Sequence, residues 1–165
     1  MRRRLLRAVT ALVALGCAIE LAFSPKPLLI WNVTASAPLG LYRRTNGPIQ
    51  RTNWVLIHAP DEARELAAVR HYLPRNVPMV KQIAAMSGDM VCRHGNAVSV
   101  NGTVKAFALD RDRYGRDLPR WEGCQHLRGD QVFVLTRPPT SFDGRYFGAV
   151  PITNLIERIE PLWTF

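Results

Sequence analysis

One serine of this chain lies in a setting that suits nucleophilic chemistry. Ser36 is part of the segment Thr34-Ala35-Ser36-Ala37-Pro38-Leu39-Gly40-Leu41-Tyr42. Pro38 pushes the residue before it toward an extended conformation, so the backbone beside the hydroxyl is expected to be extended. Gly40 permits the close approach of another backbone segment, and Tyr42 could close the motif by packing. A serine hydroxyl is a poor nucleophile, however, and needs a base that takes its proton.

Lys81 is the candidate base because its neighbours in the sequence are apolar. It lies in the run Met79-Val80-Lys81-Gln82-Ile83-Ala84-Ala85-Met86, which a Gly88-Asp89 turn follows. In an alternating strand, Lys81 shares one face with Met79 and Ile83, so its amine would point into an apolar side. Burial penalises the ammonium and lowers the lysine pKa from about 10.4, as a base that works near pH 7 requires. The alternatives are a lysine that faces water on an edge strand, and a histidine triad, for which no recognisable pattern is present.

A third segment completes a pattern that points to one family. Ser141-Phe142-Asp143-Gly144-Arg145-Tyr146-Phe147-Gly148 lies near the C-terminus. In this order, the three segments resemble those of the signal peptidase family of membrane-bound serine–lysine proteases. The continuation Pro38-Leu39-Gly40-Leu41-Tyr42 is most similar to the conjugative-transfer branch, the TraF-type pilin-processing peptidases. The resemblance extends from the N-terminal apolar segment to about Pro151.

The resemblance implies roles for the residues of the first two segments. It makes Ser36 the nucleophile and Lys81 the general base. It places the oxyanion hole at the Ser36 backbone N–H and the Thr34 hydroxyl, where the loss of one donor typically costs 100-fold or more in rate. Thr34 is explained equally well as a strand residue with a β-branched side chain.

The third segment is expected to support the base. In the family, a serine at the position of Ser141 bonds the lysine amine, and Asp143 and Arg145 match an aspartate and an arginine. The simplest role for Asp143 and Arg145 is an ion pair that holds the loop against the site, and Asp143 could also assist peptide ligation. The chain departs from the family at Gly144, where serine is common, and at Gln82, where arginine is common.

The N-terminus is expected to be a membrane anchor. A positive flank, Met1-Arg2-Arg3-Arg4 with Arg7, precedes an apolar run from Ala8 to Phe23 that only Thr10 and Glu20 interrupt. This run is shorter than the roughly 20 residues of a comfortable span, so it suits a signal peptide or a short signal anchor. The positive-inside rule places the arginines in the cytoplasm. We expect a retained anchor of the bacterial inner membrane at residues 1–24 and a periplasmic catalytic domain at residues 25–165.

The three cysteines divide into one N-terminal residue and one pair. Cys17 ends an Ala-Leu-Gly-Cys sequence that faintly resembles a lipoprotein cleavage box, although a small apolar residue within the membrane is the simpler interpretation. Cys92 and Cys124 predict a disulfide in an oxidising compartment, with Cα atoms about 4.4–6.8 Å apart. Free thiols are one alternative. A metal site with His94 and His126 is another, but the spacing is not a usual zinc pattern, and we expect neither a metal nor a cofactor.

The remaining sequence predicts many short strands and one helix. Strands are expected at residues 28–33, 39–44, 54–57, 80–86, 89–93, 97–100, 103–109, 131–135 and 152–163, with a hairpin turn at Asn101-Gly102. A helix is expected from Pro60 to about Leu73, and residues 110–128 are expected to form a charged loop. This pattern favours a mostly β domain of the small coiled-barrel type, preceded by the anchor helix.

The net charge of +9 on 165 residues restricts the partners. The basic residues are scattered, and no predicted helix has a basic face with interleaved aromatic residues, which argues against nucleic-acid binding. An anionic membrane surface suits this charge better. The expected partners are a precursor protein, membrane lipid and possible conjugation-apparatus proteins.

Together these features predict a membrane-anchored serine endopeptidase that cleaves exported precursors after small residues. A conjugative pilin subunit is the expected substrate, and capture of the acyl-enzyme by an amine instead of water would cyclise it. Two alternatives stay open: a general signal peptidase I that removes secretory signal peptides, and a non-catalytic, anchored β-barrel assembly module.

Overall fold

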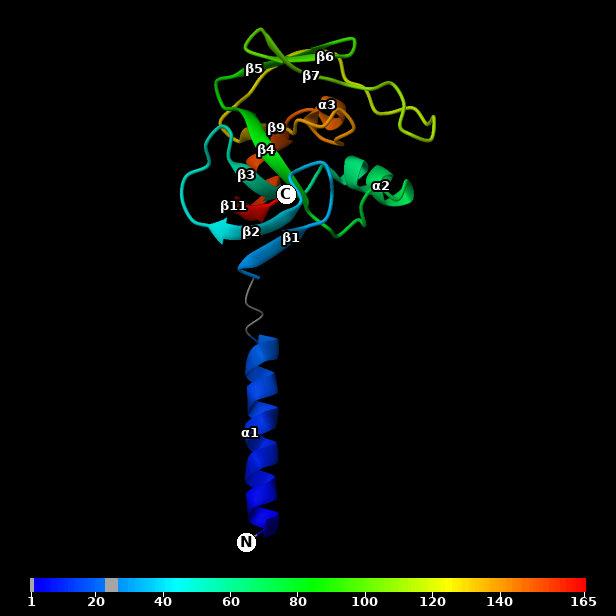
Figure 1. The fold of residues 1–165 in the computed structure, drawn as a ribbon. Coiled ribbons are helices and arrows are strands. Elements are labelled where there is room, and N and C mark those ends of the chain that lie inside the picture. The colour runs from blue at the N-terminus through cyan, green and yellow to red at the C-terminus, as the bar shows by residue number, and fades with distance from the viewer. Residues whose placement is uncertain (1, 23–26) are drawn as a thin grey trace.

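The structure, a computed structural model, describes residues 2–22 and 27–165 of the chain. A long N-terminal helix precedes a domain built mostly of short strands (Figure 1). The strands are β1 (Leu29–Asn32), β2 (Gly40–Thr45), β3 (Trp54–Ile57), β4 (Met79–Met86), β5 (Met90–His94), β6 (Ala97–Val100), β7 (Thr103–Phe107), β8 (Gly123–His126), β9 (Gln131–Leu135), β10 (Val150–Pro151) and β11 (Leu155–Thr164). The helices are α1 (Arg2–Ala22), α2 (Asp61–Val69), α3 (Gly144–Phe147) and the short 3-10 helix η1 (Ile152–Asn154). The predicted mostly β fold is confirmed.

The strands form two antiparallel sheets that β4 and β5 connect. The larger sheet has the order β1-β2-β11-β3-β4-β9-β10, and the smaller one has the order β7-β6-β5-β8. β4 is an inner strand, because β3 pairs with one side of it and β9 with the other. Lys81 is therefore not an edge-strand residue, and its backbone position is fixed from both sides.

The sheets pack around apolar side chains that alternate along the strands. The largest cluster gathers Val55 and Ile57 of β3, Ile83 of β4, and Val132 and Val134 of β9. The helix α2 adds its small buried residues Ala63 and Ala67 to this cluster, which lets the helix lie close to the sheet. Full burial of a Val or Ile side chain stabilises a fold by about 1.5–3 kcal/mol, so this cluster holds β3, β4 and β9 together.

The turn between the two sheets is held by one buried carboxylate. Asp89 accepts hydrogen bonds from Arg51 Nε at 2.9 Å, from the Met86 N–H at 2.9 Å and from Asn101 Nδ2 at 2.8 Å. The bond from Arg51 is the main reason that the pKa of this carboxyl lies well below its usual range. The predicted Gly88-Asp89 turn is thus fixed at the point where the chain leaves β4.

Two glycines lie where a side chain would collide with another strand. A Cβ atom on Gly40, whose φ is +135°, would lie 2.2 Å from the Trp163 carbonyl oxygen, so the predicted close approach of another backbone is confirmed. A Cβ atom on Gly144 would lie 2.7 Å from the Val134 carbonyl oxygen. The tight packing of α3 on β9 therefore explains why the chain has glycine, and not serine, at position 144.

Several predicted boundaries were wrong, and each has a local cause. Residues 110–128 are not all loop, because β8 forms there; its sequence Gly-Cys-Gln-His has no apolar alternation, and pairing with β5 defines it. The predicted helix 60–73 ends at Val69, since His71 adopts a left-handed φ of 57° that turns the chain. The predicted strands 103–109 and 152–163 are β7, which ends at Phe107, and β11, which follows η1.

The helix α1 coincides with most of the predicted anchor. It spans 21 residues and includes Cys17, whereas the predicted boundary at residue 24 lies outside the described residues. Within the described residues, no helix has the length and apolar character that crossing a membrane requires.

Candidate active site

The loop that carries Ser36 is wrapped around one buried amide. Asn32, at the end of β1, donates from Nδ2 to the carbonyl oxygens of Thr34 and Pro38, both at 3.0 Å, and of Ala37 at 3.3 Å. Its Oδ1 accepts from the Thr34 N–H at 3.2 Å. Because the amide satisfies the inward-facing backbone groups of the loop, the loop keeps a tight shape with the Ser36 side chain only partly buried.

Tyr42 fixes the same loop from β2. Its ring is fully buried, and its hydroxyl donates to the Pro38 carbonyl oxygen at 2.8 Å. The predicted closure of the motif by Tyr42 is therefore present, as packing together with a hydrogen bond.

Thr34 lies beside the Ser36 hydroxyl. Thr34 Oγ1 is 3.3 Å from Ser36 Oγ, and it donates to Asn32 Oδ1 at 2.9 Å. A hydroxyl has one proton, so Thr34 can donate to a further acceptor only after it leaves Asn32.

Lys81 is buried in the middle of the large sheet. Its side chain is 2% exposed, and Nζ donates to Ser141 Oγ at 2.7 Å. Burial lowers the pKa of Lys81 from its ordinary value of 10.5 to about 8, since desolvation disfavours the ammonium. The Asp143 charge opposes this shift and the Arg145 charge adds to it. A substantial neutral fraction is therefore present slightly above neutral pH.

A buried hydrogen-bond network links Ser141 to a charged pair. Thr136 Oγ1 donates to Ser141 Oγ at 2.6 Å and lies 3.3 Å from Asp143 Oδ2, and the Thr136 N–H donates to the same carboxylate oxygen at 3.0 Å. Arg145 Nε donates to Asp143 Oδ1 at 2.8 Å, and both side chains are almost completely buried. The expected ion pair is thus present, and Thr136 connects it to the partner of Lys81.

Backbone carbonyl oxygens complete the surroundings of the Arg145 guanidinium. Arg145 Nη2 donates to the Thr136 carbonyl oxygen at 2.6 Å and Nη1 to the Pro139 carbonyl oxygen at 3.1 Å. A second buried arginine, Arg93 of β5, donates to the Arg145 carbonyl oxygen at 2.6 Å. This network fixes the loop between β9 and α3, and with it the position of Ser141.

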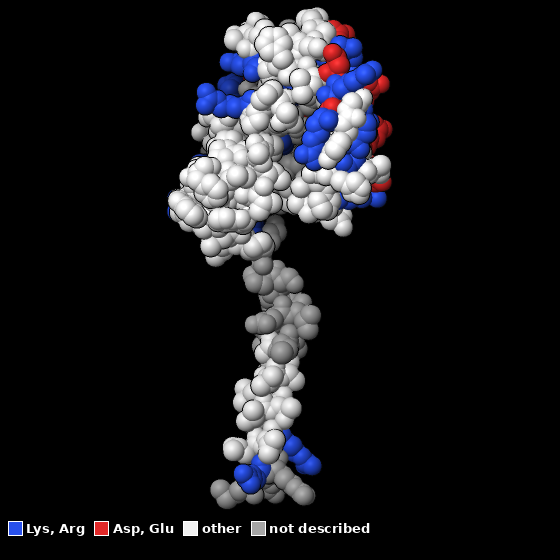
Figure 2. All heavy atoms as spheres, turned by 45° about the vertical axis from the view of Figure 1, so that its right-hand side comes forward, with Lys and Arg blue, Asp and Glu red and all other residues white. Residues whose placement is uncertain are grey.

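Ser36 and Lys81 open into the same cleft, which has a volume of about 770 Å³. Other lining residues come from β1, from the segment before β4 and from the loop of residues 109–118. Figure 2 shows a hollow in the β-domain with charged side chains gathered on one side of it and mostly uncharged residues on the other. Among the described residues, no hydrogen bond joins Ser36 Oγ directly to Lys81 Nζ.

The structure brings together the predicted Thr34, Ser36, Lys81, Ser141, Asp143 and Arg145, and it adds two residues that the sequence did not reveal. These are Asn32 and Thr136, each a buried polar residue at the end of an apolar strand. That position was the only available signal, and it is too common to be specific. The departure at Gln82 is accommodated, because Gln82 Nε2 donates to the Thr52 carbonyl oxygen at 2.9 Å.

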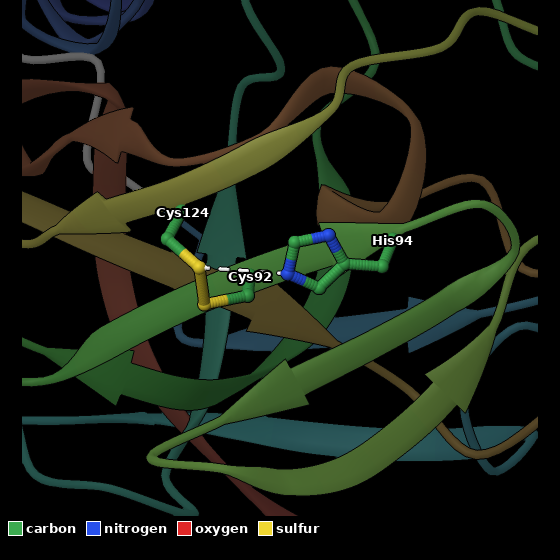
Figure 3. A group of neighbouring side chains, drawn as sticks. All are labelled: Cys92, His94 and Cys124. Atoms are coloured by element: carbon green, nitrogen blue, oxygen red, sulfur yellow. Dashed lines mark hydrogen bonds between the residues drawn. A yellow bond between two sulfur atoms is a disulfide. The ribbon is translucent and has the colours of Figure 1, made fainter.

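The cysteine pair lies in the small sheet and forms the predicted disulfide (Figure 3). Cys92 of β5 faces Cys124 of β8, and their Cα atoms are 4.0 Å apart. The predicted pairing is confirmed, whereas the predicted separation of about 4.4–6.8 Å was wrong, because the two cysteines lie directly opposite each other on paired strands.

His94 lies next to this disulfide. Its Nε2 is 3.7 Å from Cys124 Sγ, and the ligand atoms of Cys92, His94 and Cys124 all lie within 4.8 Å of one another (Figure 3). A metal would need the cysteines as thiolates, whereas the two sulfur atoms are bonded to each other here. His126, the second histidine considered as a metal ligand, is not part of this group in the described part of the chain.

Lys81 is thus a buried lysine on an inner strand of a β-rich domain, and it shares one cleft with Ser36. Comparison of the whole chain with known families gives a result that fits this arrangement. The model of the family "Signal peptidase, peptidase S26" matches residues 1–163. This chain therefore belongs to that peptidase family.

Its relatives include proteins of conjugation. It is 32% identical over 145 residues to a plasmid transfer protein TraF of Escherichia coli, covering 81% of this chain and 82% of the relative. It is 32% identical over 149 residues to a conjugal transfer protein TraF of Agrobacterium fabrum, covering 81% of each chain. A solved signal peptidase I of Enterococcus faecalis aligns with a TM-score of 0.43 and 18% identity, over 70% of this chain and 100% of that one. The family assignment rests on the sequence matches.

Proposed function

We propose that this chain is a serine endopeptidase in which Ser36 is the nucleophile and Lys81 the general base. The observation that carries the proposal is that Lys81 is buried at the cleft that Ser36 also lines. This burial lowers the pKa of the Lys81 amine to about 8. A neutral amine can take the Ser36 proton as Oγ attacks the substrate carbonyl carbon. The resulting ammonium can then protonate the leaving amine.

Ser141 orients the base in this scheme. Since Lys81 Nζ donates to Ser141 Oγ, the nitrogen lone pair is left for the Ser36 proton. Ser36 and Lys81 must come closer than they are here, and catalytic hydrogen bonds commonly shorten only when substrate is bound. Asp143 and Arg145 act through Ser141, as a buried pair that keeps the loop in place.

The oxyanion forms next to the Ser36 N–H and the Thr34 hydroxyl. The Ser36 N–H is not used by another acceptor among the described residues, which leaves it free for a substrate oxygen. Thr34 would rotate from Asn32 to become the second donor. Such paired donors stabilise the charge that develops in acyl transfer.

The substrate is a precursor protein, and a conjugative pilin subunit is the best candidate, because the relatives are plasmid and conjugal transfer proteins. Cleavage follows a small residue. The acyl-enzyme is then hydrolysed by water or captured by an amine of the substrate, which gives a cyclic product.

Residues 1–24 hold residues 25–165 at the bacterial inner membrane, on the periplasmic side. The basic N-terminal flank supports this topology. An exposed aromatic group adds support: Trp31, Trp163 and Phe165 lie together, with ring centroids 5.5–6.5 Å apart, and tryptophan favours the membrane–water interface. The disulfide suits an oxidising compartment.

The test is to incubate the full chain with the pilin precursor of its own transfer system and to measure product masses. We expect a shortened product, and a mass lower by one further water if the product is cyclic. Ser36→Ala and Lys81→Ala should each give no product while the domain remains folded. Wild-type cleavage by either variant would refute the dyad, and cleavage of secretory precursors alone would identify a general signal peptidase.

A further inference from the structure

The two sides of the catalytic cleft have different chemistry. On one side, β1 and the segment before β4 contribute apolar residues, including Leu29, Trp31 and Val77. On the other side, the loop of residues 109–118 contributes Asp112 and Arg113. This difference matches the division between uncharged and charged surface in Figure 2.

The charged side is a fixed structure, because Asp112 organises it. Asp112 accepts hydrogen bonds from the Tyr72 hydroxyl, from the N–H groups of Tyr114 (2.9 Å) and Arg116 (3.0 Å), and from Arg116 Nε (2.7 Å). Arg70 Nη1 lies 3.9 Å away. The negative charge of Asp112 is therefore compensated within the protein and repels an incoming anion only weakly.

Arg113 differs from its neighbours in this loop because its charge has no counterpart. Among the described residues, no carboxylate oxygen lies within 4.0 Å of its side chain, whereas Arg111, Arg116 and Arg120 each have one. The guanidinium lies 4.7 Å from the centre of the Tyr114 ring, and Nη2 donates to the Tyr114 hydroxyl at 2.8 Å. Tyr114 thus holds the arginine partly ordered while other N–H groups stay available.

We propose that Arg113 binds a carboxylate of the substrate, so that the enzyme prefers precursors with an acidic group close to the scissile bond. This inference rests on the proposed endopeptidase function. A planar guanidinium matches a carboxylate with two parallel hydrogen bonds, and the exposed Arg113 side chain at the cleft is accessible to one. The carboxylate can be an acidic side chain or the C-terminus of the precursor, since both present the same group.

The test compares peptides that differ only in this charge. One series replaces Glu or Asp near the cleavage site by Gln or Asn, and a second converts the C-terminal carboxylate into an amide. For the wild type, kcat/KM should fall about tenfold when the essential carboxylate is neutralised, as expected for a charged hydrogen bond. The series that shows the drop identifies the source of the carboxylate.

The variants Arg113→Gln and Arg113→Glu separate recognition from stability. Arg113→Gln should reduce the preference for the acidic peptide to about one, and Arg113→Glu should prefer a peptide with Lys at the same position. Lys105→Glu makes the same change of charge on β7, outside the cleft, and should keep the wild-type preference.

Binding of the same peptides to Ser36→Ala, measured by fluorescence anisotropy, reports the charge preference without any cleavage. A failure of the Ser36–Lys81 assignment and a failure of the Arg113 assignment are therefore distinguishable. Equal binding of acidic and neutral peptides, or an undiminished preference in Arg113→Gln, would overturn the inference.

Discussion

At the scale of single residues, the burial of Lys81 has a cost for folding with a definite sign. Folding lowers the pKa of the amine from 10.5 to about 8, so the folded state binds the proton less tightly than the unfolded chain. Stability therefore falls as pH decreases from 10.5 toward 8 and levels off below that range. A shift of this size corresponds to about 3 kcal/mol.

Replacement of Lys81 by methionine should remove this cost. We expect Lys81→Met to be inactive and to unfold at a higher temperature than the wild type at pH 7, with the difference shrinking toward pH 10.5. The measurement is thermal unfolding of both proteins across this range.

The exposed Lys105 provides the control, since Lys105→Met should show no such dependence on pH. The stability difference between Lys81→Met and the wild type should be larger at pH 7 than at pH 10.5. An equal or smaller difference at pH 7 would show that burial does not hold Lys81 neutral.

The residues of the candidate site differ in how far the sequence predicts them. Ser36 and Lys81 each lie in a distinctive local sequence. Both could therefore be predicted as site residues before the structure showed that they line the same cleft. Asn32 and Thr136 could not, because their importance comes from hydrogen bonds to groups up to seven residues further along the chain, which form only once the loops have folded. No local sequence pattern marks such a buried amide or hydroxyl.

At the scale of elements, the connection between β9 and α3 supplies the groups that support Lys81, the proposed base. β9 pairs with β4, and Leu135 faces Gln82, so the residue after β9 lies next to Lys81. Thr136 occupies that place and joins Ser141 to Asp143. The strand pairing, not the local sequence, brings these groups together.

Thr136→Val tests this connection. Valine keeps the shape and removes the hydroxyl, so the buried Ser141 side chain loses a hydrogen-bond partner, which costs about 1–3 kcal/mol. We expect kcat to fall about tenfold or more with little change in KM, because Thr136 does not line the cleft.

Thr136→Ser keeps the hydroxyl and should recover most of the rate. Steady-state kinetics of both variants, at temperatures where both are folded, distinguish the outcomes. Wild-type kcat for Thr136→Val would exclude a role for this hydroxyl in positioning Ser141.

The elements also show where sequence patterns stop being informative. Strands with alternating apolar residues, such as β3 and β6, lie where they were predicted. β8 was missed because its strand conformation depends on pairing with β5 and on the disulfide, both of which join residues far apart in the sequence. The early end of α2 depends on the left-handed backbone conformation of His71, and no glycine or proline at that point of the sequence predicts it.

At the scale of the whole molecule, the β-rich domain and its loops form a cleft with an apolar side and a charged side. The apolar side includes Leu29, Trp31 and Val77, and the charged side carries Arg113, which has no carboxylate within 4.0 Å in the described part of the chain. Lys81, the proposed base, lies deep in the larger sheet, where the core that stabilises the fold also keeps its amine out of water.

The most direct test of the central claim is covalent labelling of the nucleophile. The full chain is treated with a β-lactam-type or lipopeptide acylating agent across pH 6 to 10, and the adduct is located by peptide mass mapping. We predict one adduct on Ser36, formed at a rate that rises through an apparent pKa of about 8 and absent in Lys81→Met. An adduct on another residue, or Ser36 labelling with an apparent pKa near 6.5 that survives Lys81→Met, would contradict the assignment of Lys81 as the base.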